Sequence, residues 1–153
     1  MSSAFKTTLF GIASGLIWSL IAILLRAQFL FNPDESIFVV LLVGATTGVA
    51  VSFALKVPLM KFGKTGSVIL GLIALPLGIF IFGFIFALFE MIAGNPESFN
   101  GTNGFNLITA FKTALYTTFL GCIYSCYLLP LAILTTIILR KVIRPENDLS
   151  LKH

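Results

Sequence analysis

The chain has 153 residues, of which 58% are hydrophobic and 10% are charged, and its formal net charge is +4. An average soluble domain carries about 25% charged residues, so this composition excludes an ordinary soluble globular domain. The small and dispersed positive charge also argues against direct nucleic-acid binding. The sequence therefore predicts one integral membrane domain over residues 1–153, with the lipid bilayer as its solvent.

Four long segments contain no charged residue, and their lengths match membrane spans. The uncharged runs contain 19, 20, 25 and 27 residues and cover 7–25, 36–55, 65–89 and 113–139. Crossing about 30 Å of hydrocarbon takes roughly 20 helical residues, and backbone groups in lipid must be paired within their own segment. We expect an all-α membrane protein, a small bundle of four transmembrane helices, with spans at about 8–30, 36–56, 67–92 and 113–139 and a tail over 140–153.

The first and second spans each carry a stripe of small residues at intervals of four, and each stripe contains a G-x-x-x-G motif. The stripes consist of Gly11, Gly15 and Ser19 in the first span and of Gly44, Gly48 and Ser52 in the second. Helices in a membrane associate through close backbone contact at small residues. The stripes predict packing surfaces, either within one chain or between subunits. The second interpretation favours a homo-oligomer.

The third and fourth spans each contain a proline near mid-depth, at Pro76 and Pro130. Proline removes the hydrogen bond to the carbonyl four residues earlier, so we expect a kink at each position. Broken helices occur at transporter binding sites, but proline is also common in membrane helices as a simple kink. Cys122 and Cys126 lie four residues apart in the fourth span and are interpreted as small packing residues, because no histidine lies nearby.

Basic residues concentrate in alternate connections of the chain. Lys6 precedes the first span, three lysines follow the second, and the fourth ends in a basic tail. By the positive-inside rule, both termini and the loop over 56–66 are cytoplasmic. The expected location, which the resemblance in topology described below favours, is a bacterial inner membrane. The candidate contacts for a cytoplasmic partner or for lipid headgroups are Lys56, Lys61, Lys64, Arg140, Lys141 and Arg144.

Two ionisable residues, Arg26 and Glu90, approach the hydrocarbon from within predicted spans. In the orientation above, both lie in the outer leaflet at similar depth. The hypothesis is that they form an ion pair, within one subunit or between two. The alternative is that each side chain reaches the interface independently.

Catalytic chemistry is not indicated by the residues present. His153 is the single histidine, and no catalytic, phosphate-binding or metal-binding motif occurs in the chain. A nucleophile with a nearby base cannot be assembled inside the spans. We therefore expect a protein that is not an enzyme and that uses no cofactor and no metal.

In topology, the chain is similar to small four-span bacterial inner-membrane proteins. These include immunity proteins against pore-forming bacteriocins and the membrane subunits of anti-phage systems such as Kiwa. We expect a non-enzymatic subunit that oligomerises and anchors or signals to a cytoplasmic partner, in bacterial host defence. One alternative is a small channel or transporter, which the midplane prolines and the polar Thr46 and Thr47 favour. Another is an immunity or exclusion protein that binds a toxin or phage component.

Overall fold

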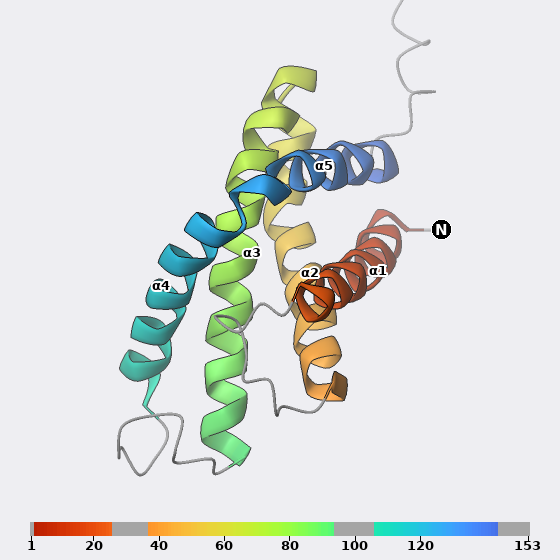
Figure 1. Ribbon diagram of the computed structural model, residues 1–153. Coiled ribbons are helices and arrows are strands. Elements are labelled where there is room, and N and C mark those ends of the chain that lie inside the picture. Colours follow the sequence, from red (N-terminus) through yellow and green to blue (C-terminus); the bar gives the residue numbers. More distant parts are fainter. Residues whose placement is uncertain (1, 26–36, 94–105, 144–153) are drawn as a thin grey trace, which may run out of the picture.

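The computed structural model describes residues 2–25, 37–93 and 106–143, and these residues are helical almost throughout (Figure 1). Five α-helices and one short 3-10 helix follow in the order α1 (Ser3–Leu24), α2 (Ile37–Lys61), α3 (Lys64–Ala93), α4 (Leu107–Tyr124), η2 (Cys126–Leu128) and α5 (Leu129–Ile143). No strand occurs among the residues described. Five segments are long and apolar enough to cross a membrane: four within α1 to α4, and a fifth over Cys126–Ile143. The expectation of an all-α membrane protein is therefore consistent with the structure.

Helices α1, α3 and α4 begin earlier than the spans expected from the uncharged runs, and a capping side chain stands before α1 and before α4. Ser2 precedes α1, and its Oγ accepts a hydrogen bond of 3.3 Å from the Phe5 amide. Asn106 precedes α4, and its Oδ1 accepts from the amides of Ile108 and Thr109, at 3.0 and 3.3 Å. Such caps satisfy amides that have no partner within the helix.

The connection between the second and third helices is shorter than the loop expected over 56–66. Helix α2 continues to Lys61 and α3 begins at Lys64, so two residues separate them. Pro58 lies inside α2 and does not end it; the Phe62 amide still donates to the Pro58 carbonyl at 2.9 Å. The chain is therefore non-helical only at residues 62–63 in this segment.

The span expected over 113–139, with a kink at Pro130, consists of two α-helices, because the chain leaves the α-helix at Ser125. This residue has φ −111° and ψ 10°, and the Leu128 amide donates to its carbonyl at 2.9 Å, three residues back. The Leu129 amide then donates to the Cys126 carbonyl. Pro130 explains the position of the break, because its ring would clash with the Cys126 carbonyl in a continuous α-helix and it has no amide proton to donate there.

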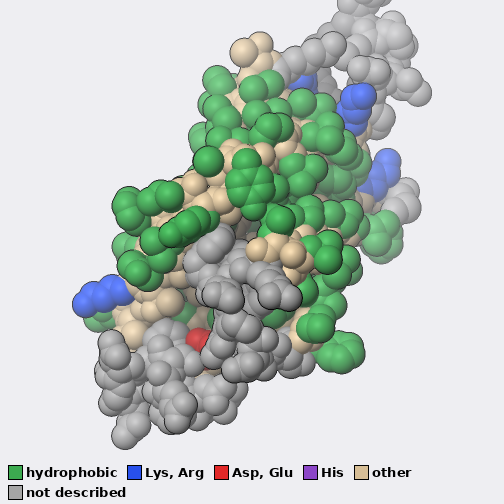
Figure 2. Space-filling view, in the orientation of Figure 1, with side chains coloured by type: hydrophobic (Ala, Val, Ile, Leu, Met, Phe, Trp, Pro, Cys, Tyr) green, Lys and Arg blue, Asp and Glu red, His purple; other side chains and the backbone are tan. Residues whose placement is uncertain are grey.

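The helices pack around α2 and α3, which stand side by side in Figure 1. Helix α1 lies against α2, α4 lies against α3, and α5 crosses from the end of α4 towards the start of α1. Three buried apolar clusters join these helices. The first lies between α2 and α3 and consists of Val40, Val43, Phe82 and Phe86. The second joins α2, α3 and α5 and consists of Leu55, Leu59, Leu70 and Leu139, and the third joins α3 and α5 and consists of Leu75, Ile79 and Ala132. Many large apolar side chains remain exposed, which suits a lipid environment (Figure 2).

Candidate functional site

The two stripes of small residues pack against each other, antiparallel, within one chain. A Cβ atom added at Gly15 would overlap the Gly44 carbonyl, and one added at Gly48 would overlap the Gly11 carbonyl. At Gly11, a Cβ would lie 2.7 Å from the Cα of Val49. Only glycine permits this approach of one backbone to another. The surface formed by these glycines is therefore used between α1 and α2 and is not open to a second copy of the chain.

A buried hydrogen bond continues this contact one turn further along α1. Ser19 is 3% exposed, and its Oγ donates to the Val40 carbonyl on α2 at 3.2 Å. The same oxygen fills the space beside Gly44, where a Cβ would collide with it. Ser52, the last member of the α2 stripe, is also buried and borders a cavity.

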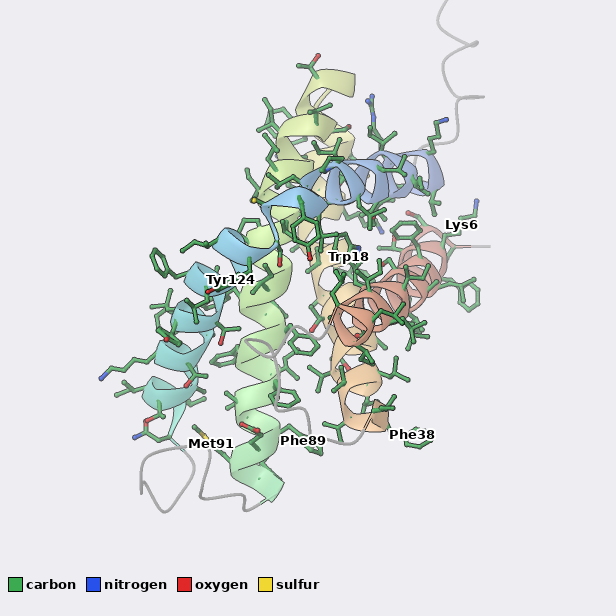
Figure 3. All side chains as sticks on the ribbon, viewed as in Figure 1. Lys6, Trp18, Phe38, Phe89, Met91 and Tyr124 are labelled. Atoms are coloured by element: carbon green, nitrogen blue, oxygen red, sulfur yellow. The ribbon has the colours of Figure 1, made fainter. Side chains whose placement is uncertain are left out.

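A cavity of about 560 Å³ lies among all the helices, and its wall is formed by α1, α2, α3, the end of α4, η2 and α5. Trp18 of α1 and Tyr124 of α4 both line it and come from different sides of the bundle (Figure 3). Gly78 contributes from α3 and Thr135 from α5. Ligand sites in proteins typically have volumes of about 300–1,000 Å³ and mostly apolar walls, so this cavity has the size and character of a site.

The polar side-chain groups of the described cavity lining are hydroxyls and the indole N–H of Trp18. Serine, threonine and tyrosine side chains are interspersed among aliphatic and aromatic ones, and the described lining contains no Asp, Glu, Lys, Arg or His. Thr47 of α2 is 7% exposed, and its Oγ1 is the one buried side-chain polar atom of the described residues without a hydrogen-bond partner. Its neighbour Thr46 faces outwards and donates to the Leu42 carbonyl at 2.9 Å.

The break between α4 and α5 lies at the cavity wall, where Tyr124, Ser125, Tyr127 and Leu128 all contribute. Irregular backbone at membrane depth is tolerated where it is buried in protein or lines a cavity. Two features of the sequence pointed to this site: Pro130 and the polar pair Thr46 and Thr47. The sequence alone does not show which of the two threonines faces the cavity.

Most of the described basic residues lie towards one end of the bundle, and Lys112 of α4 is the exception. Helices α1 and α2 are antiparallel, so Lys6 lies towards the end of α2 that carries Lys56 and Lys61. Arg140 of α5 donates from Nη1 to the Ser67 Oγ near the start of α3, at 3.4 Å, and Lys141 follows it. In Figure 2, most of the visible Lys and Arg side chains lie at the upper right, around the end of α5 and the start of α1. We call Lys6, Lys56, Lys61, Arg140 and Lys141 the basic end.

Glu90 and Pro76 are described residues that belong to neither the cavity lining nor the basic end. Glu90 is 7% exposed near the end of α3. Arg26 and Arg144 and the side chain of Lys64 lie outside the described residues, so the ion pair of Arg26 with Glu90 stays a prediction. Pro76 lies within α3, which continues unbroken around it.

The chemistry-bearing side chains show no further cluster in the described part of the chain. Cys122 is half-buried and Cys126 is exposed, and both are free thiols. Over the described ranges, no group of three or more His, Cys, Asp or Glu residues is placed to hold a metal ion. No family model, curated protein or solved structure matches the chain.

Proposed function

We propose that this protein is a non-enzymatic membrane subunit that anchors, or signals to, a cytoplasmic partner through its basic end. The observation that carries the proposal is the convergence of five basic side chains from three helices at one end of the bundle. Lys61 and Lys141 are exposed there and available to an acidic surface. Oligomerisation is not part of this proposal, because the glycine stripes that favoured it are occupied by each other.

We infer that the basic end faces the cytoplasm of a bacterial cell, according to the positive-inside rule. The same proposal treats α4 and α5 as one interrupted crossing. Each of the two segments is long enough to cross a membrane by itself, so the support for a single crossing is where the two helices pack along α3. Helix α4 packs beside the second half of α3, where the rings of Phe80 and Phe111 are 5.5 Å apart, whereas α5 packs beside the first half. Four crossings then account for five helices.

The anchoring proposal is tested by charge reversal of exposed lysines at the two ends. We expect Lys61→Glu combined with Lys141→Glu to abolish co-purification of the cytoplasmic partner with the full chain, with membrane insertion unchanged. Lys112→Glu is the matched control, because Lys112 is an exposed lysine on α4, away from the basic end. Equal retention of the partner by both variants would overturn the proposal.

The cavity beside the broken helix favours a second candidate function, that of a small transporter. Discontinuous helices near the midplane border the substrate sites of many transporters. The test is flux of uncharged solutes into liposomes that contain this protein alone. Solute uptake above that of protein-free liposomes supports transport, and its absence with correctly inserted protein leaves the anchoring proposal in place.

A further inference from the structure

We propose that the cavity is a binding site for an uncharged amphipathic molecule with an apolar body and a polar head group that hydrogen-bonds to the Thr47 hydroxyl. The inference is independent of the anchoring proposal, because none of the residues of the basic end lines the cavity.

The size and composition of the wall define the body of the ligand. A cavity of about 560 Å³ admits a molecule much larger than water, and its wall is built mainly from aliphatic and aromatic side chains such as Trp18, Leu75 and Phe82. An ionised ligand would have to leave water for a site whose described lining offers no opposite charge, which is costly at low dielectric. The ligand is therefore neutral.

The position of Thr47 defines where the polar group of the ligand lies. The large majority of buried side-chain polar atoms in proteins have a hydrogen-bond partner. Thr47 Oγ1 has none among the described residues, although the adjacent Thr46 shows that a helical threonine in this segment can donate to the carbonyl four residues earlier. Thr47 lines the cavity, and a hydroxyl or carbonyl of a bound molecule would satisfy it.

A neutral glyceride has this chemistry, and it can reach the site from the bilayer or from the aqueous phase. The experiment uses the purified full chain in lipid nanodiscs and a monoacylglycerol with a ten-carbon, diazirine-bearing chain. After illumination, labelled peptides are mapped by mass spectrometry. The probe is supplied either within the nanodisc lipid or from the aqueous phase, and the arm that labels faster identifies the source. A fatty acid with the same chain, measured at pH 8, is the charged comparator.

We expect saturable labelling within the cavity-lining parts of α2, α3 and α5, and little labelling there by the fatty acid. Thr47→Val, which keeps the side-chain shape, should weaken binding about three- to tenfold, the loss expected for one hydrogen bond. Thr46→Val is the matched control and should bind as the native protein does. Gly78→Leu should prevent binding, because its side chain would enter the cavity from α3.

A second measurement keeps the test independent of folding defects. Without probe, Thr47→Val should melt at or above the native temperature, because it removes a hydroxyl that has no partner. Equal affinities for Thr47→Val and Thr46→Val would overturn the proposal. So would labelling that does not saturate and lies only on lipid-facing residues, or equal labelling by the fatty acid.

Discussion

Ser19 of α1 donates a hydrogen bond of 3.2 Å to the carbonyl of Val40 on α2, and this bond lies one helical turn beyond the contact of Gly15 with Gly44. The hydrogen bond requires the glycine contact beside it, and the reason is geometric. The glycines bring the two backbones together, and only at that separation does a short serine side chain reach the opposite backbone. The bond therefore depends on the glycine contact, and the glycine contact does not depend on the bond.

Replacement of Ser19 by alanine should consequently have a small effect. We expect the free energy of unfolding to fall by about 0.6 kcal/mol, the mean for hydrogen bonds between membrane helices. Unfolding of the purified protein in mixed micelles, followed by circular dichroism, measures the change. A loss above about 2 kcal/mol would show that Ser19 does more than donate this bond.

Addition of one methyl group at Gly15 should be more damaging than the loss of the hydrogen bond. In Gly15→Ala, the new Cβ overlaps the Gly44 carbonyl, a backbone atom that cannot rotate away, and we expect a loss of about 1–3 kcal/mol. Gly78→Ala is the control, because its Cβ would meet only Val51 Cγ2, at 4.0 Å. This control should be neutral or stabilising by up to about 1 kcal/mol. The same unfolding assay compares the two, and equal effects would refute the assignment of the stripe.

Removal of Pro130 should straighten the path from α4 to α5. Spin labels at the exposed positions Phe119 and Ile138 report the distance between the two helices. In Pro130→Ala, we expect this distance to lengthen towards about 28 Å, the length of 19 residues of continuous helix. Pro76→Ala should leave the same distance unchanged. If Pro130→Ala has no effect, packing of α5 on α3 maintains the break rather than the proline ring.

The interrupted crossing makes a separate prediction about the two sides of the membrane. Single cysteines are placed at Leu107 and Lys141, both exposed, in a chain that carries Cys122→Ser and Cys126→Ser. If α4 and α5 form one crossing, a membrane-impermeant maleimide added outside intact cells should label position 107 and not position 141. Labelling of both positions from the same side would mean that α4 and α5 cross separately.

The uncharged runs and the glycine spacing predicted the helices and the packing face of α1 and α2, because both patterns are local in the sequence. Gly11, Gly15, Gly44 and Gly48 lie at intervals that make a helix face, whatever that face contacts. The two prolines show the limit of local reasoning. Pro76 and Pro130 were equivalent in sequence, yet α3 accommodates one while the chain breaks before the other. Helix α5 packs on α3 at Gly71, a long-range contact that no local pattern contains.

The candidate site was less predictable than the fold, because a cavity is a property of the assembled helices. Thr46 and Thr47 are adjacent and chemically identical, and the sequence offered both as polar residues of the second span. Their difference depends on the rotation of α2, which the contact of Gly44 and Gly48 with α1 determines. Once that contact is known, Thr47 faces inwards and Thr46 outwards.

Helix α5 contributes residues both to the cavity wall and to the basic end. Its residues Thr135 and Thr136 border the cavity, and Arg140 and Lys141 lie one turn further along the same helix. The 3-10 helix η2 joins α5 to α4, and near the other end of α5 Arg140 donates a hydrogen bond to Ser67 of α3. A rigid displacement of α5 at the cavity wall would therefore also displace Lys141 and strain the contact of Arg140 with Ser67. The cavity and the basic end differ in chemistry, but helix α5 is part of both.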